Sequence, residues 1–156
     1  MSTRMTQFSA AIELATRAHQ YKFDLCRQPY LWHVLRVAGA MGTDFDATIV
    51  AMLHDVIEDS NIGLPEILDK FSDFTASALW ALSRQSGEPY PDYIKRLLKW
   101  SKAHERGEIA IKVKLADLAD NLRPERLAAA QAHGADVSRL VRKYVRAIAT
   151  LEGFEW

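Results

Sequence analysis

Apolar residues recur at three- and four-residue spacing through almost the whole chain, and this pattern restricts the fold more than any other feature. One apolar stripe begins at Phe8 and continues to Ala18, and another runs through residues 137–151. Residues at this spacing share one face of a helix. No stretch shows sustained alternation of apolar and polar residues, so strands have little support. The sequence therefore predicts an all-α fold.

Proline, glycine and capping residues divide this helical pattern into short segments. Pro29 opens a segment that runs to Gly42, and Thr43 or Asp44 is suited to cap the next helix. Residues 47–53 are almost entirely apolar, which is typical of a central, buried helix. Further start signals stand at Pro65, Ser72, Pro91, Glu108 and Pro124. These signals predict a single compact helical bundle of about eight or nine helices, spanning residues 1–156 as one domain.

The composition excludes several classes of function. The 20 basic and 20 acidic side chains give a formal net charge of zero, which argues against a broad basic surface for nucleic acid. The only cysteine, Cys26, cannot form an internal disulfide or a multi-cysteine zinc site. No apolar run approaches the roughly 20 residues of a membrane span, and the N-terminus lacks a signal-peptide core. We therefore expect a cytoplasmic protein with no nucleic-acid or membrane partner, and the oligomeric state stays open.

A histidine and three acids follow the apolar helix directly. Residues 47–53 carry His54 and Asp55 into the interior, where unpaired polar groups are costly. Glu58 and Asp59 follow within about one helical turn. The burial of a histidine together with several acids is physically reasonable when a cation holds them. This block therefore predicts a metal site.

Two other segments supply candidate partners for this block. His33 lies among apolar and aromatic residues in the segment after Pro29. In the segment 111–121, Lys114, Asp117 and Asn121 stand at i, i+3 and i+7 and share one helix face. Asp120 points elsewhere, and we expect it to be an ordinary solvated acid.

The order His33, His54-Asp55 and Asp117 resembles the H…HD…D pattern of HD-domain metal-dependent phosphohydrolases. The finer resemblance is to the hydrolase domain of RelA/SpoT-type enzymes and to the small alarmone hydrolases, and it covers residues from about 8 to 125. It is carried by Ala18-His19, Pro29-Tyr30, the HDVIED block at 54–59, and the KLAD run at 114–117 with Asn121.

This resemblance implies an all-helical hydrolase that removes pyrophosphate from the 3′ position of a nucleotide alarmone. It also implies one divalent metal, usually manganese, on four ligands: His33, His54, Asp55 and Asp117. Glu58 and Asp59 match the pair that positions the attacking water and moves its proton, and Asn121 matches a substrate contact. Two imidazoles and two carboxylates also suit six-coordinate manganese or iron(II) better than tetrahedral zinc.

The chain departs from the family pattern where the base is expected to bind. Asp24 and Leu25 stand where the guanosine hydrolases usually carry an Arg-Lys pair, and Pro124 stands where threonine is frequent. Both departures concern the nucleotide and leave the metal ligands intact. An acidic Asp24 is able to accept a hydrogen bond from the exocyclic amine of adenine. Our hypothesis is that an adenosine alarmone is hydrolysed at least as well as a guanosine one.

A basic segment between the two halves of the predicted metal site has two interpretations. Tyr93 and Arg96 either face the cleft or belong to an ordinary solvated amphipathic helix. In the first case Arg96 binds phosphate oxygens in pairs through its planar fork. Together with Lys114, these residues complete the candidate substrate contacts.

Three functions are compatible with these observations. The leading one is a 3′-pyrophosphohydrolase of a (p)ppGpp- or (p)ppApp-like alarmone. The second is another HD phosphohydrolase that releases orthophosphate from a nucleotide, such as a nucleotidase or a dinucleotide phosphatase. The third is a non-catalytic nucleotide-binding module, which four intact ligands and the Glu58-Asp59 pair argue against. The released product, pyrophosphate or orthophosphate, separates the first two.

Overall fold

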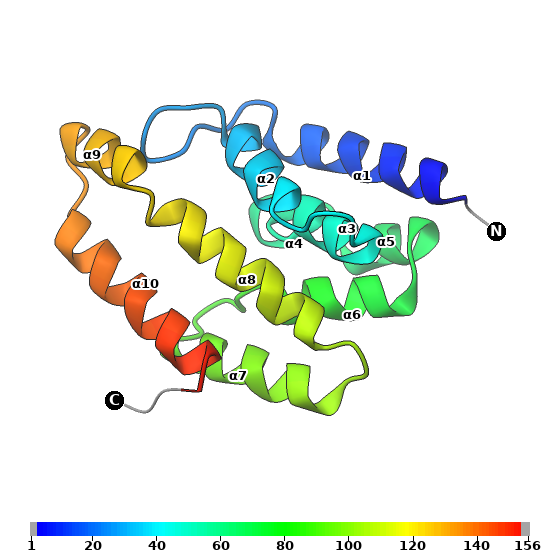
Figure 1. The fold of residues 1–156 in the computed structure, drawn as a ribbon. Coiled ribbons are helices and arrows are strands. Elements are labelled where there is room, and N and C mark those ends of the chain that lie inside the picture. Colours follow the sequence, from blue (N-terminus) through cyan, green and yellow to red (C-terminus); the bar gives the residue numbers. More distant parts are fainter. Residues whose placement is uncertain (1–2, 154–156) are drawn as a thin grey trace.

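A computed structural model describes residues 3–153, and this part of the chain forms ten helices and no strand (Figure 1). The helices are α1 Arg4–His19, α2 Tyr30–Gly39, α3 Phe45–Leu53, α4 Val56–Asp59, α5 Leu64–Lys70, α6 Asp73–Leu82, α7 Tyr90–Ala103, α8 Glu108–Asn121, α9 Pro124–Ala132 and α10 Val137–Leu151. The expected all-α fold is confirmed. The helix count exceeds the expected eight or nine because the end of the HDVIED block forms the separate four-residue helix α4.

Helix α3 occupies the centre of the fold, as its apolar composition predicts. Its residues from Ala47 to Leu53 are buried except Thr48, and the helix packs against α1, α2, α6 and α8. Of the two expected caps, Asp44 is the one used, because its carboxylate accepts a hydrogen bond from the Ala47 amide at 3.0 Å. Since the whole helix is buried, the residue that follows it, His54, lies in the interior.

Helix α8 crosses the molecule between two groups of helices (Figure 1). It packs against α2 and α3 on one side and against α7 and α10 on the other. The turn that leads into α8 requires glycine at position 107, because a Cβ atom there would lie 2.1 Å from the carbonyl oxygen of Ser101. This placement brings residues of α8 against the end of α3 and the start of α2.

The loop between α1 and α2 packs against α9 (Figure 1). Asp24 shapes this loop by accepting hydrogen bonds from the amides of Cys26 and Gln28. The Cys26 thiol donates to the carbonyl of Arg126 at 3.2 Å, which ties the loop to α9. Among the described residues, no helix is both long and apolar enough to cross a membrane.

Candidate functional site

Two buried histidines present the same ring nitrogen to a common point. His33 lies in α2 and His54 follows α3, and their ring centroids are 5.5 Å apart. The Nδ1 of His33 contacts Asp120 Oδ2 at 2.7 Å, and the Nδ1 of His54 contacts the Ala51 carbonyl at 2.7 Å. Because each Nδ1 is held by an acceptor, each Nε2 is left to bind something else.

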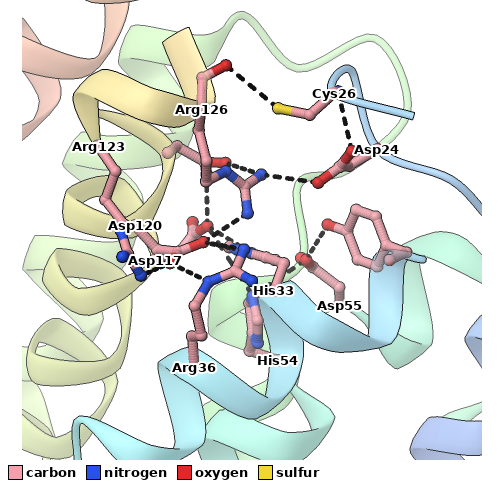
Figure 2. A network of polar contacts seen from close by, with 12 residues as sticks. Asp24, Cys26, His33, Arg36, His54, Asp55, Asp117, Asp120, Arg123 and Arg126 are labelled. Carbon is pink, nitrogen blue, oxygen red and sulfur yellow. Dashed lines mark hydrogen bonds and ion pairs between the residues drawn. The ribbon is translucent and has the colours of Figure 1, made fainter. Parts of the chain in front are cut away.

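Carboxylates surround these two Nε2 atoms. Asp55 Oδ2 lies 3.0 Å from the Nε2 of His54, and Asp117 Oδ1 lies 3.1 Å from the Nε2 of His33 (Figure 2). In the described part of the chain neither Nε2 has a hydrogen-bond partner, although both are buried. Ligand atoms of His33, His54 and Asp55 lie within 4.8 Å of one another, the spacing that a shared metal ion requires. Buried nitrogens that make no hydrogen bond and lie beside carboxylates are suited to hold a cation.

The charges of the cluster favour a cation at the same point. Burial lowers the pKa of His54, but Asp55 and Asp117 outweigh burial and raise it to about 9. Burial raises the pKa of the Asp117 carboxyl, yet Lys114 and the two histidines hold it well below its usual range. The acids are therefore ionised, and a proton or a metal competes for the histidine nitrogens.

Asp120 is not the solvated acid that we expected from its position on α8. Its side chain is only 6% exposed and binds His33, Arg36 and Arg126 (Figure 2). The expectation failed because its three partners come from α2 and α9, which one helix face does not reveal. Burial raises the pKa of Asp120, but the hydrogen bonds from His33 and Arg36 outweigh burial and lower it. Asp120 thus remains an anion that orients the imidazole of His33.

Asp59 and Glu58 differ in their surroundings although they are neighbours. Burial, followed by the nearby Asp55, raises the pKa of the Asp59 carboxyl to about 6. The side chain of Lys22 donates to the Asp59 carbonyl and its Nζ lies 3.9 Å from Asp59 Oδ2. Glu58 is exposed and its carboxylate accepts from the Arg84 amide at 2.9 Å. Asp59 is therefore the better placed of the two for proton transfer near neutral pH.

Two further buried groups at the site were given no role from the sequence. The Tyr30 hydroxyl donates to Asp55 Oδ2 at 2.5 Å. His19 is buried 4.9 Å from the Tyr30 ring, and burial lowers its pKa to about 4, so it is neutral. Neither of its ring nitrogens has a hydrogen-bond partner within the described residues. The only sequence signal was their place in the Ala18-His19 and Pro29-Tyr30 pairs.

Lys114, Asp117 and Asn121 lie together, as their shared helix face predicts. Lys114 Nζ contacts Asp117 Oδ2 at 2.7 Å, and the Asn121 amide donates to Asp117 Oδ1 at 2.8 Å. In the structure, Lys114 and Asn121 therefore hold the Asp117 carboxylate. We propose that they also contact the substrate.

Arg96 does not face the site, which corrects the first interpretation for this residue, whereas the Tyr93 ring centroid lies 5.3 Å from Lys114 Nζ. Tyr93 is buried and its hydroxyl donates to the Leu82 carbonyl at 2.6 Å. Arg96 uses its guanidinium on both oxygens of Glu88 and on the carbonyls of Ser83 and Ala81. These bonds hold the loop between α6 and α7, so Arg96 has no donor fork left for phosphate. Spacing alone did not show which face of α7 packs inward.

Asp24 lines a cavity beside the cluster, but its carboxylate is already engaged. Besides the two loop amides, Asp24 Oδ2 lies 3.3 Å from the guanidinium of Arg126 (Figure 2). Arg126 also binds Asp120 at 2.6 Å and the Asn121 side-chain oxygen at 3.2 Å. The cavity thus contains an arginine from α9, Arg126, and Asp24 holds this arginine in place. Because the Asp24 carboxylate is engaged in this way, it is poorly placed to accept a hydrogen bond from a base amine, as we had expected it to do.

This cavity has a volume of about 330 Å³ and continues from the cluster. Tyr30 and Asn121 belong to both, since they line the cavity and bind Asp55 and Asp117. Its other walls are largely apolar: Phe23, Leu25, Cys26, Leu127, Ala130, Leu140 and Tyr144. A cavity that combines these apolar walls with the polar side chains of Asp24, Asn121 and Arg126 suits a flat heteroaromatic group.

Curated proteins with similar sequences support the resemblance seen in the motifs. The chain is 27% identical over 125 residues to a guanosine-3′,5′-bis(diphosphate) 3′-pyrophosphohydrolase of Aquifex aeolicus, covering 75% of this chain and 17% of that protein. It is 35% identical over 66 residues, 40% of this chain and 10% of the relative, to a protein of the same name from Borreliella burgdorferi. The chain thus matches a small part of much longer proteins. No family model matches it.

A solved structure confirms the fold. A metazoan ortholog of SpoT, described as hydrolysing ppGpp, superposes with a TM-score of 0.59 and covers 96% of this chain and 97% of its own. The two chains are 18% identical. The sequence matches confirm the resemblance to RelA/SpoT-type 3′-pyrophosphohydrolases, and the solved structure confirms the all-helical fold.

Proposed function

We propose that the chain is a metal-dependent 3′-pyrophosphohydrolase of a nucleotide alarmone. The observation that carries this proposal is the pair of buried Nε2 atoms, on His33 and His54, which make no hydrogen bond within the described residues and lie 3.1 and 3.0 Å from the carboxylates of Asp117 and Asp55. The names of the sequence relatives support the same reaction and the same class of substrate.

The residues present fit a divalent metal. We propose His33, His54, Asp55 and Asp117 as its ligands, with Asp120 and the Ala51 carbonyl fixing the two imidazoles. This mixed nitrogen and oxygen set favours manganese or iron(II) over zinc, and we propose manganese. When bound, such an ion supplies Lewis acidity to a phosphate oxygen and lowers the pKa of water.

Asp59 is the proposed proton acceptor. With a pKa near 6 its carboxylate is largely ionised at neutral pH and still basic enough to accept a proton. In the reaction a water oxygen forms a bond to the phosphorus that carries ribose O3′, and the P–O3′ bond breaks. The proton lost from water passes to Asp59 and is available for O3′, and pyrophosphate leaves. Glu58, exposed beside Asp59, is the proposed partner that helps to position the attacking water.

The cavity next to the cluster is the proposed position of the nucleobase. Tyr30 and Asn121 place this cavity directly beside the proposed ligands Asp55 and Asp117. The two terminal nitrogens of Arg126 contact Asp24, Asp120 and Asn121, while its Nε is buried without a hydrogen-bond partner among the described residues. We propose that the guanidinium held in this way offers a flat face for stacking. Stacking recognises any purine, so this arrangement supports activity on both guanosine and adenosine alarmones.

Product analysis tests the proposal. The purified chain, loaded with manganese, is incubated with ppGpp, ppApp and nucleotides bearing a single 3′- or 5′-phosphate. We expect pyrophosphate and the corresponding nucleoside 5′-diphosphate from the alarmones. Release of orthophosphate alone would favour a nucleotidase or dinucleotide phosphatase. Tight nucleotide binding without any product would favour a binding module.

A further inference from the structure

A second hollow, away from the metal cluster, lies between α7 and α10, which pack side by side (Figure 1). Its volume is about 570 Å³, within the range of small-molecule sites. Four cations from α10 line it: Arg139, Arg142, Lys143 and Arg146. They stand at i, i+3, i+4 and i+7, so they share one helix face over about 10 Å.

These four cations have no acidic partner among residues 3–153, in contrast to most arginines around the metal cluster. No ion pair joins any of them to a described carboxylate, although the whole chain carries as many acids as bases. The residues that line the hollow include no Asp or Glu. A charge-neutral chain thus places an uncompensated positive face over a cavity, which attracts a polyanion.

Two features fix the polar side of this hollow. Lys143 Nζ lies 4.1 Å from the centroid of the Tyr90 ring, so its position is set by a cation–π contact. Burial lowers the pKa of Lys143, and the nearby Lys114 and Arg84 lower it further against the opposing effect of Glu58 and Asp117. The hydroxyl of Tyr90 is buried and has no hydrogen-bond partner within the described residues.

The floor of the hollow is apolar and is formed by Pro91, Ile94 and Ala147. A flat, weakly polar group covers such a surface well, while the cations above it bind phosphate oxygens. The span of about 10 Å along α10 exceeds what one phosphate occupies and suits a chain of several. Both halves of the hollow therefore match one class of ligand.

We propose that the hollow between α7 and α10 is a second binding site for a nucleoside polyphosphate, with the phosphates on the α10 cations and the base on the apolar floor. Tyr90 adjoins both this site and the metal cluster, since its ring centroid lies 4.1 Å from Lys143 Nζ and 5.9 Å from Lys114 Nζ. The proposal does not depend on the reaction assigned to the cluster.

Binding of GTP, which has no 3′-phosphate to remove, tests this site. Isothermal titration is carried out on the full chain, on Asp55→Asn, and on the double variant Arg142→Gln/Arg146→Gln. Both arginines are exposed, so the double variant is expected to keep its helical circular dichroism. We expect GTP to bind Asp55→Asn as it binds the unmodified chain. We expect the double variant to lose at least about tenfold in affinity, since charge-assisted hydrogen bonds contribute on that order.

The matched control is Lys99→Gln/Lys102→Gln, which removes two exposed cations from the far part of α7. Its affinity for GTP is expected to be unchanged, and an equal loss would overturn the site in favour of a general charge effect. Loss of binding in Asp55→Asn with none in the α10 variant would place GTP at the metal cluster and overturn the proposal. Inorganic triphosphate that binds as tightly as GTP would overturn the assignment of the base to the apolar floor.

Discussion

The metal cluster and the hollow between α7 and α10 place charge in opposite ways. At the cluster, anions and cations are matched one against another: Asp117 against Lys114, and Asp120 against Arg36 and Arg126. In the hollow, the α10 cations face apolar residues and one another within the described chain. A buried charge must be matched to be tolerated, whereas a charge at the rim of a hollow is hydrated and costs little alone. The metal cluster is therefore held in place by its own ion pairs before anything binds, whereas the negative charge that balances the α10 cations has to come from the ligand.

Asp55→Asn gives the largest effect, because it removes a proposed ligand from the matched cluster. We expect activity to fall to background and bound metal to be lost, while the helical circular dichroism is kept. Elemental analysis and product release measure the two effects. The control is Asp69→Asn, an exposed acid on α5, which should keep both. Equal metal in the Asp55 variant and the unmodified chain would contradict the ligand assignment.

Asp59→Asn tests whether the half-buried acid near the cluster moves a proton. We expect turnover to fall by about 10²–10⁴-fold with metal content unchanged, the usual contribution of a general acid–base group. Glu58→Gln, at an exposed carboxylate, is expected to have the smaller effect.

The pH profile sharpens this assignment. A proton acceptor works only when ionised, so the rate of the unmodified enzyme should rise with pH through the pKa of Asp59, about 6, or lower once a metal cation is bound. Asp59→Asn should remove this limb. A limb that persists in the variant would assign it to another group.

The structure brings together the four residues that the family resemblance implies as ligands, but the sequence did not reveal the groups that support them. His54 and Asp55 were placed by the apolar helix before them, and Asp117 was placed by its register with Lys114 and Asn121. Asp120 was missed because its burial depends on Arg36 and Arg126, which other helices bring. One available signal was the pair His33 and Arg36, three residues apart on α2, since both require an acid on the facing helix.

The error at Arg96 has a related cause. An amphipathic pattern defines two faces, and the packing of α7 against α6, α8 and α10 decides which face each side chain joins. Arg96 pairs with Glu88 because of the path of the loop from 83 to 89, and this path cannot be predicted from a helical repeat in the sequence. In the same way, an arginine from α9 occupies the space beside Asp24, although the local sequence around Asp24 contains no sign of it.

Asp120→Asn tests whether the matching of charge at the cluster matters for the metal. The variant leaves Arg36 and Arg126 without their buried anion and weakens the orientation of His33. We expect the affinity for manganese to fall by about 10–100-fold, as for other residues that orient metal ligands. Glu125→Gln, an exposed acid paired with Arg123, is the control and should bind manganese normally. An unchanged manganese affinity in Asp120→Asn would show that His33 is oriented without it.

Arg126→Leu tests the proposed stacking surface in the nucleobase cavity. We expect KM to rise by roughly two- to thirtyfold, the range of a cation–π contact, with a smaller change in kcat. The rise should be similar for ppGpp and ppApp, because stacking does not read the edge of a base. Arg17→Leu, an exposed arginine on α1 that pairs with Glu66, is the control. A rise confined to the guanosine compound would show that Arg126 contacts an edge of guanine.

Arg146→Gln gives the smallest expected effect, and its sign distinguishes the two regions. Arg146 follows Arg142 by four residues and Lys143 by three on the same face of α10, so it is repelled by both in the absence of a ligand. Like charges at this spacing destabilise a helix by about 0.2–0.5 kcal/mol, and glutamine has nearly the helix propensity of arginine. The variant should therefore be slightly more stable than the unmodified chain in urea unfolding at low salt, and the gain should shrink as salt screens the repulsion. Lys70→Gln is a control of opposite sign, because Lys70 follows Glu66 by four residues on α5 and its loss removes an attraction. A loss of stability in Arg146→Gln would mean that this arginine has a structural partner, and the hollow would then resemble the cluster in matching its charges before any ligand binds.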